Sequence, residues 1–216
     1  MQLQDIFNKI FDSNAYRDAK IASYSKRNPF YYFFEEEIPR AMRTIVNRLQ
    51  YPLTISYECK GSIGAGVLAD TFWFNVMNPK ITQDPQRGVY IVYLVAPAGD
   101  CIYLCLIQST GIIMSEAQLE QIEPGLKDRS KKIYEAFHQS LVDQGKLDAL
   151  EKFKVGSVNL GARLSLTSRA YEAAVIMSKA YKKLNGVPVE ADLLDDLKAM
   201  LDVYTRYYTL ERLGNV

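Results

Sequence analysis

The chain has 216 residues, of which 48% are hydrophobic and 24% are charged, and its formal net charge is +1. This composition is typical of an ordinary globular protein. No apolar stretch reaches the ~18 residues that a membrane span needs, and residues 1–10 lack the apolar core of a signal peptide. We therefore expect a cytoplasmic protein with no membrane partner. Nucleic-acid binding would depend on a local basic face rather than on total charge.

Residues 1–50 carry helical patterns. Apolar residues recur at helical spacing near the N-terminus. The acidic run Glu35–Glu37 suits the positive end of a second helix. Pro39 is tolerated because it lies in the first turn of that helix, and Pro52 is expected to end it.

Between residues 51 and 110 the apolar pattern changes to the alternation of strands. Strands are predicted over 53–59, 71–77, 88–95 and 101–108, with a glycine-rich turn at 60–66 and a hairpin loop at 96–100. Such short connections favour antiparallel pairing.

Residues 111–216 return to helical patterns. Ser115 and Gln118 resemble a capping box, and Pro124-Gly125 is predicted to break the first helix. Further helices are predicted over 127–144, 168–184 and 190–213, with one strand over 154–160. We expect an α+β fold in which an antiparallel sheet of about four to five strands is flanked by N-terminal and C-terminal helices. One domain should span 1–216, helical over 1–50, sheet over 51–110 and mainly helical over 111–216.

The residues of catalytic and metal sites are scarce. The three cysteines, Cys59, Cys101 and Cys105, are too few and too sparse for a disulfide framework, so buried thiols are expected. The only histidine, His138, lacks the partners of a zinc site or a Ser-His-Asp triad. We therefore predict a non-catalytic binding domain with no cofactor and no metal.

The glycine run Gly61, Gly64 and Gly66 follows a predicted strand, as phosphate-binding loops do. Its spacing fits neither nucleotide fingerprint, and the strand predicted after it offers no helix N-terminus. A simple tight turn is one interpretation. The other is a ligand contact in which Lys60, Ser62 and nearby amides hold a nucleic-acid phosphate.

The strand over 71–77 carries the only tryptophan. Alternation places Phe72, Phe74 and Val76 on one face, which we expect in the core, and Trp73 and Asn75 on the other. Trp73 is either an ordinary amphipathic sheet residue or a stacking platform for a flat ligand.

Two further patterns suggest other chemistry. Glu58-Cys59-Lys60 matches the end of a metal-dependent nuclease motif, but residues 50–57 supply no second carboxylate. Basic residues also cluster, and the set in the C-terminal half is expected to be a solvated helix face rather than a DNA contact. The clusters are Arg40, Arg43 and Arg48, and Lys127, Arg129, Lys131 and Lys132.

The order of these features resembles the McrB-like N-terminal domain family of modification-dependent restriction systems. The resemblance covers residues from about 35 to 210 and depends on the spacing of several short segments. These are Gly61-Ser62-x-Gly64-x-Gly66 after Tyr57, Trp73, residues 80–82, Gln86-x-Gly88-x-Tyr90, residues 102–108, residues 171–181 as a penultimate helix, and a last helix around Leu197 and Tyr204. The chain departs from the family at Phe72, where proline is common, and at Ser109, where glycine is common.

The resemblance implies a specificity module of a restriction or phage-defence system that binds DNA and leaves cleavage to a GTPase or nuclease partner. A modified base would be extruded into an aromatic pocket. Trp73 would stack on it, while Lys60, Ser62, Gly64 and Gly66 hold phosphates and Asn75, Gln108 and Ser109 read polar edges. Two alternatives stay open: a protein-interaction scaffold of a defence system, and a metal-dependent nuclease that uses Glu58 and Lys60.

Overall fold

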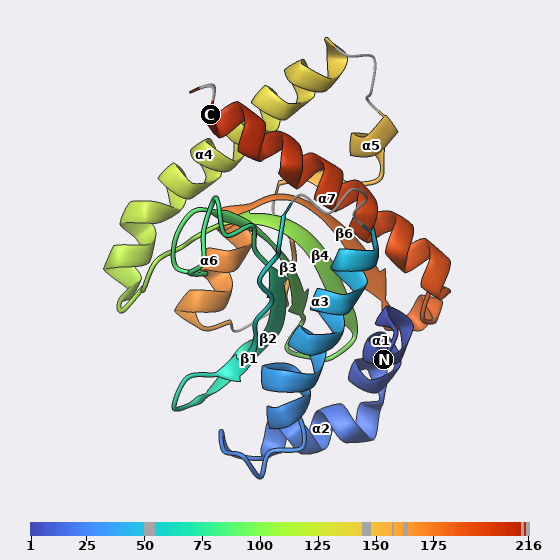
Figure 1. Ribbon diagram of the computed structural model, residues 1–216. Coiled ribbons are helices and arrows are strands. Elements are labelled where there is room, and N and C mark those ends of the chain that lie inside the picture. The colour runs from blue at the N-terminus through green and yellow to red at the C-terminus, as the bar shows by residue number, and fades with distance from the viewer. Residues whose placement is uncertain (50–54, 144–147, 157, 162–163, 213, 215–216) are drawn as a thin grey trace.

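The computed structural model describes residues 1–49, 55–143, 148–156, 158–161, 164–212 and 214. Helices surround a central sheet of six strands in the order β1-β2-β3-β4-β6-β5 (Figure 1). Every neighbouring pair is antiparallel. The α+β fold with an antiparallel sheet is therefore confirmed, although the sheet has six strands rather than four to five.

The strands are β1 (Gly61–Gly64), β2 (Leu68–Val76), β3 (Val89–Val95), β4 (Cys101–Gln108), β5 (Lys154–Val155) and β6 (Val175–Lys182). Their register divides the side chains between two faces. Phe74 pairs with Tyr93 and then Leu104, and these define the Phe74 face. Trp73 pairs with Leu94 and then Tyr103, and these define the Trp73 face. The predicted strands at 88–95 and 101–108 are confirmed.

The Phe74 face is fully covered by helices. These are α1 (Leu3–Phe11), α2 (Ser13–Ile21), the π-helical turn Phe33–Glu37, α3 (Ile38–Leu49) and α7 (Glu190–Arg212). Phe74 stacks on Tyr93 with ring centroids 4.6 Å apart, and Phe34 packs against Phe72. Phe72, Phe74 and Val76 are buried, so the predicted core face is confirmed.

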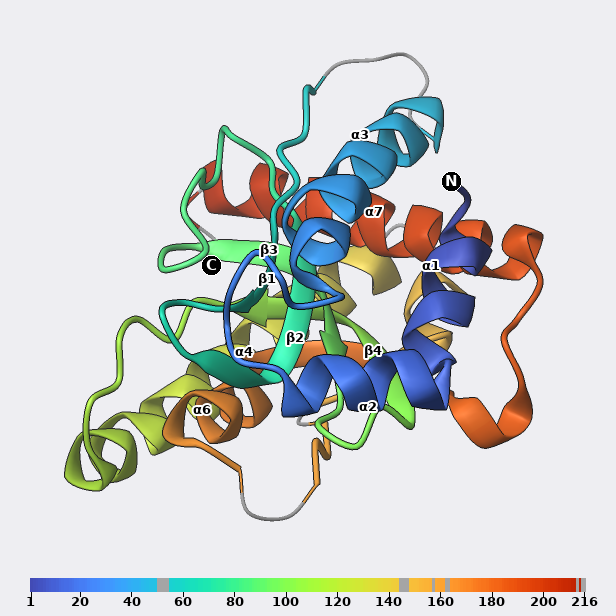
Figure 2. The ribbon, with the colours of Figure 1, turned by 90° about the horizontal axis from the view of Figure 1, so that it is seen from below.

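The Trp73 face is covered over only part of its width. Helix α6 (Leu166–Ala174) packs against β4, and Figure 2 shows α6 and α1 on opposite sides of the strands. Helix α4 (Glu116–Val142) packs against α6 and β6 and also reaches α7, where Phe137 packs against Tyr207. Figure 1 shows α6 on the side of the sheet away from α1 and α3. The end of the sheet formed by β1 and β2 is the more open part of this face, because Trp73 is only partly buried there, whereas Tyr90, Val92 and Leu94 of β3 are buried. Helix α5 (Asp148–Glu151) lies beside α7.

The prediction of a strand over 53–59 and a turn over 60–66 is wrong for the described residues. Residues 55–60 form only an isolated bridge between Glu58 and Met77, and β1 begins at Gly61. A Cβ at position 61 would lie 2.1 Å from the carbonyl oxygen of Phe34, so only glycine lets the strand lie this close to the π-helical turn. The predicted end at Pro52 lies outside the described residues.

The predicted helix over 168–184 is also wrong in its second half, because α6 ends at Ala174 and β6 begins at Val175. Residues 175–178 are buried between β4 and β5. The β-branched pair Val175-Ile176 suits such a strand, and ladder pairing with β4 outweighs the local helical pattern. Of the strand predicted over 154–160, only Lys154 and Val155 form β5.

Helix α4 continues through Pro124 and Gly125, where a break was predicted. Both residues are exposed, so the carbonyl left without a donor by Pro124 faces water. An ion pair between Glu123 and Lys127 spans the same turn at 2.6 Å. The capping interaction of Ser115 with the Gln118 amide is confirmed, and the predicted stop at Gly145 lies outside the described residues.

The cysteine thiols are all buried and free, as predicted. None of the helices in the described part of the chain combines the length and the apolar character that a membrane crossing requires. One hydrophobic cluster contains residues from Leu3 to Leu210. That a single domain spans 1–216 stays a prediction.

Candidate nucleic-acid interface

Trp73 lies on β2 at the open end of the Trp73 face, and its side chain is partly buried. Ser62 is its partner on β1 and Leu94 its partner on β3. Trp73 and Ser62 line two separate hollows, one on the sheet and one beside α3. This tryptophan therefore joins two surfaces of different chemistry.

The first hollow, here called the aromatic cavity, has a volume of about 460 Å³. Its floor is formed by residues of the Trp73 face, and Tyr171 of α6 contributes a wall. The floor residues are Trp73, which is partly buried, and Tyr90, Val92, Leu94 and Ile107, which are buried. Ligand sites in proteins commonly have volumes of ~300–1,000 Å³ and mainly apolar, aromatic linings. The cavity is thus of a size and character that suit a flat heterocycle.

Polar groups gather on one side of this cavity. The Ser165 amide donates to Asp70 Oδ2 at 2.7 Å, and the hydroxyls of Thr71 and Ser168 are 2.9 Å apart. All four residues line the cavity. Because these contacts join the start of α6 to β2, they fix the distance between Tyr171 and Trp73.

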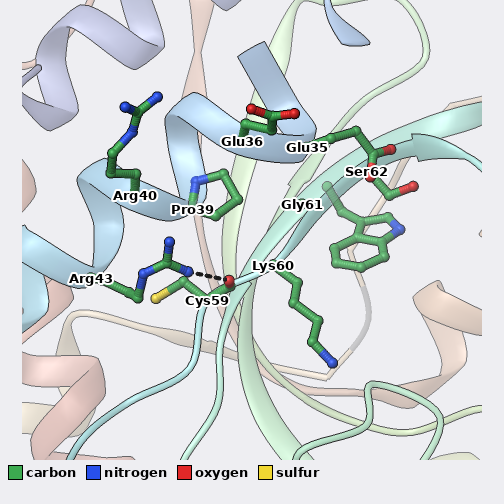
Figure 3. A pocket seen from close by; sticks show the side chains of 10 residues that line it. Glu35, Glu36, Pro39, Arg40, Arg43, Cys59, Lys60, Gly61 and Ser62 are labelled. Atoms are coloured by element: carbon green, nitrogen blue, oxygen red, sulfur yellow. Dashed lines mark hydrogen bonds between the residues drawn. The ribbon is translucent and has the colours of Figure 1, made fainter. Parts of the chain in front are cut away.

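The second hollow, here called the basic groove, has a volume of about 580 Å³ and lies between α3 and the segment that leads into β1. Figure 3 shows Arg40 and Arg43 projecting from α3, and Lys60 projecting from the segment before β1 with its ammonium pointing away from the two guanidinium groups. Arg43 Nη1 donates to the Cys59 carbonyl at 3.2 Å, and Lys60 Nζ donates to the Gln83 carbonyl at 2.8 Å. Among the described residues, none of these three cations forms an ion pair.

The cations of α4 contrast with those of the basic groove. Lys127, Lys131 and Lys132 are exposed and each forms an ion pair within the helix, with Glu123, Glu135 and Asp128 respectively. Their charges are therefore locally balanced, which agrees with the solvated helix face that the sequence predicts.

Two carboxylates reduce the positive charge of the basic groove, since Glu35 and Glu36 lie in its wall. Glu35 Oε1 accepts a hydrogen bond from the Ile63 amide at 3.3 Å. Burial raises the pKa of the Glu35 carboxyl above its ordinary value, partly opposed by that hydrogen bond. Glu35 thus loses its negative charge at a higher pH than an exposed carboxylate would.

The glycine-rich hairpin is stabilised by its own hydrogen bonds. Ser62 Oγ donates to the Gly64 carbonyl at 2.7 Å and accepts from the Gly64 amide at 3.0 Å. Gly64 has a φ of +148°, and a Cβ there would lie 2.0 Å from the Val67 carbonyl. Close backbone contacts therefore explain why residues 61 and 64 are glycines. Ser62 and Gly64 also line the aromatic cavity.

The remaining predicted site residues, Asn75, Gln108, Ser109 and Gly66, lie at different places relative to the two hollows. Asn75 is buried and lines neither hollow; its Oδ1 accepts from the Lys60 amide at 2.9 Å, and its Nδ2 has no partner among the described residues. Gln108 is 1% exposed and shares the Phe74 face with Leu106, and its amide nitrogen donates to Leu126 and Ser130. Gln108 and Ser109 line neither hollow, and Gly66 lies in the exposed hairpin turn.

Several residues of these hollows were not predicted as site residues. In the sequence, Arg40 and Arg43 form only a basic cluster, and Tyr171 only begins the segment that resembles the family's penultimate helix. Asp70 and Ser168 carried no signal, because they are 98 positions apart and meet only through the packing of α6 on β2.

A metal-dependent nuclease needs several acidic or other metal-binding side chains in one place. Within the residues that the structure describes, no three His, Cys, Asp or Glu side chains converge as a metal site would require. Glu58 lies in the isolated bridge to Met77. The nuclease alternative stays a hypothesis, which a cleavage assay with Mg²⁺ tests.

The sequence of the chain matches a known protein family. A family model described as "MrcB-like, N-terminal domain" matches residues 13–209, which is most of the chain. The resemblance drawn from the sequence is thereby confirmed. No curated protein matches the chain.

Proposed function

Because the chain belongs to the MrcB-like N-terminal domain family, we propose that it is a DNA-specificity module of a restriction or phage-defence system. Domains of this family are DNA-binding modules of restriction systems. In the proposal the module recognises a modified base by extruding it into the aromatic cavity. A GTPase or nuclease partner then cleaves the DNA.

The observation that carries the proposal is that Trp73 borders both the aromatic cavity and the basic groove. An extruded base remains attached to its phosphates, so a pocket for the base needs a phosphate-binding surface next to it. Three cations that form no ion pair within the described part of the chain lie beside an aromatic hollow, and together these two surfaces would meet both needs.

Each residue has a defined role in this proposal. Trp73 stacks on the extruded base, and Tyr90 and Tyr171 form the surrounding aromatic wall. Lys60, Arg40 and Arg43 bind the flanking phosphates, and the exposed backbone of the Ser62 to Gly66 hairpin approaches the same strand. Asn75 is the other proposed contact to the base edge: its buried Nδ2 has no partner among the described residues, and because the side chain lines neither hollow, this contact requires the residues around it to rearrange.

In this proposal Gln108 has a different role from the one that the resemblance implies, and Ser109 stays a prediction without a contact to either hollow. Gln108 fastens α4 to the sheet through Leu126 and Ser130. Asp70 and Ser168, which line the cavity, are better placed to meet polar atoms of a base.

The proposal is tested by replacing Trp73. Trp73→Ala should weaken binding of a duplex with a modified base by ~1–3 kcal/mol, the usual value of stacking on one base. Trp73→Phe should retain most of the affinity, because it keeps an aromatic face. Tyr32→Ala is the matched control, since Tyr32 is exposed and lines neither hollow.

Affinities are measured by fluorescence anisotropy, with folding checked by circular dichroism. A folded Trp73→Ala variant with wild-type affinity would refute the stacking role. Salt-independent or absent DNA binding by the wild-type chain would instead favour the protein-interaction scaffold.

A further inference from the structure

The outer edge of β6 is only partly covered by β5. Strand β5 pairs with Met177 and Ser178, whereas residues 179–182 pair with β4 on the inner side alone. Both Ala180 and Lys182 are exposed. In the described part of the chain, no strand lies beside this half of the edge. Open edges of this kind are templates for pairing with another extended segment.

The hydrogen bonds with β4 determine which backbone groups of this edge point outward. Hydrogen-bonded and non-hydrogen-bonded pairs alternate along an antiparallel ladder. The Lys183 amide donates to the Asp100 carbonyl at 2.8 Å, so this pair is of the bonded kind. Counted along the register, Ala180 and Lys182 fall in non-bonded pairs, and their backbone amides therefore point away from β4.

The pairing of β6 with β5 has the same phase. The Gly156 amide donates to the Ile176 carbonyl at 3.1 Å on the outer side, so the even-numbered residues of β6 point outward. Beyond the reach of β5, three outward groups have no hydrogen-bond partner among the described residues: the amides of Ala180 and Lys182 and the carbonyl of Ala180. These groups are available to a segment from outside.

A hollow of about 510 Å³, here called the edge hollow, lies against this edge. Its lining includes Ala180 and Lys182 of β6, Asn185 and Pro188 of the turn that follows, and Asp192 and Asp195 of α7. The edge hollow shares no lining residue with the aromatic cavity or the basic groove, and β6 is separated from β1 and β2 by β3 and β4. It is therefore a separate surface from the candidate nucleic-acid interface.

The charges of the edge hollow favour a basic side chain on its α7 side. Lys152 pairs with Asp195, and Lys179 pairs with Asp196, so these charges are locally balanced. Asp192 is exposed and forms no ion pair within the residues that the structure describes. A cation brought in by a partner would balance Asp192.

We propose that the uncovered edge of β6, residues 179–182, binds an extended segment of another protein. The segment adds to the sheet as a strand and carries a basic side chain opposite Asp192. Its backbone supplies acceptors for the two outward amides and a donor for the Ala180 carbonyl, as in other complexes formed by strand addition. A residue opposite Tyr181 faces α7, because Tyr181 itself donates to Asp196 of that helix at 2.9 Å. This inference does not depend on DNA binding.

A second copy of the same edge fits less well than a different protein. Antiparallel pairing centred on Ala180 would bring the copy's Lys182 opposite Ser178. That position is already filled by Lys154 of β5. The segment therefore has to come from a chain without this obstruction.

The test uses two short, fluorescein-labelled peptides, one in which lysine alternates with valine and one in which glutamate replaces the lysine. Ala180→Pro removes the outward amide without removing a bond to β4, and Ala180→Val is its control because it keeps that amide. Asp192→Lys reverses the charge, and Asp202→Lys makes the same change on the same helix outside the edge hollow. Anisotropy reports affinity, and amide hydrogen exchange reports protection of positions 180 and 182.

The wild type should bind the lysine peptide about tenfold more tightly than the glutamate peptide, and exchange at both amides should slow. Ala180→Pro should weaken binding about fivefold, as expected for one lost hydrogen bond, and Asp192→Lys should remove the preference for lysine. Both controls should behave as the wild type does, and all variants should keep the wild-type affinity for DNA.

Absence of binding to the lysine peptide, or binding that neither Ala180→Pro nor Asp192→Lys changes, would overturn the proposal. If circular dichroism shows that Ala180→Pro is unfolded, Asp192→Lys decides alone, since it leaves the backbone as it is. Self-association of the wild type that Ala180→Val retains and a folded Ala180→Pro loses would assign the edge to a second copy, which also contradicts the proposal.

Discussion

Removal of the three cations of the basic groove should reduce the salt dependence of DNA binding. The change is the triple variant Arg40→Gln, Arg43→Gln and Lys60→Gln. Each cation that contacts a phosphate contributes ~0.9 to the slope of log affinity against log salt concentration. Three contacts therefore account for a slope of ~2.7, which is a loss of affinity of ~40-fold between 50 and 200 mM salt.

The measurement is a series of binding isotherms over that salt range for the wild type and the variant. The matched control replaces three lysines of α4, Lys127, Lys131 and Lys132, with glutamine. It removes the same total charge, but from residues that are each paired with a carboxylate of the same helix. The control should retain most of the wild-type slope.

An equal reduction of the slope in both triple variants would show that net charge, rather than the basic groove, determines DNA binding, and would refute the role of the groove. Urea unfolding of the groove variant provides a necessary check, because Arg43 also bonds to the Cys59 carbonyl. A loss of affinity that reflects unfolding would appear there as a lower transition midpoint.

Three further predictions concern pH and stability. Burial raises the pKa of Glu35, so affinity for DNA should increase about twofold as the pH falls from neutrality toward that pKa, and Glu35→Gln, assayed by anisotropy, should remove this dependence. Gly61→Ala should lower the free energy of unfolding by about 1–3 kcal/mol, because its Cβ would overlap the Phe34 carbonyl; wild-type urea stability would disprove this close approach. Asp196→Ala should cost about 1–3 kcal/mol in the same assay, because Asp196 accepts hydrogen bonds from Lys179 at 2.6 Å and from Tyr181 at 2.9 Å; Lys198→Ala, which removes an exposed pair, should cost less than 1 kcal/mol.

Sequence patterns that extend over only a few residues predicted the central strands of the sheet correctly. Residues 88–95 and 101–108 were predicted as neighbouring antiparallel strands, and β3 and β4 occupy nearly the same bounds. Alternation alone placed Phe72 and Phe74 in the core and Trp73 on the opposite face. Period and turn residues act over a few positions, so a single chain contains the information that determines them.

The same local rules misassigned residues 175–182. Val175 to Lys182 continues the pattern of α6, and nothing in that segment alone shows that the edge of β4 is available for pairing. Likewise, alternation along the sequence predicts that Gln108 and Ile107 lie on opposite faces of β4. It does not predict which of the two faces carries the cavity.

The sequence by itself determined the family, the antiparallel pairing at the centre of the sheet, and Trp73 as the aromatic group to examine. Only the tertiary structure decided what surrounds Trp73. Tyr171 and Ser168 reach the cavity from α6, almost a hundred positions along the chain, and Ile112 reaches its rim from a loop. Whether a cation forms an ion pair likewise depends on which carboxylate lies within a few ångströms. Lys131 pairs with Glu135, whereas Arg40 forms no ion pair among the described residues. Distances between segments far apart in the sequence come from packing, and packing is a property of the whole folded chain.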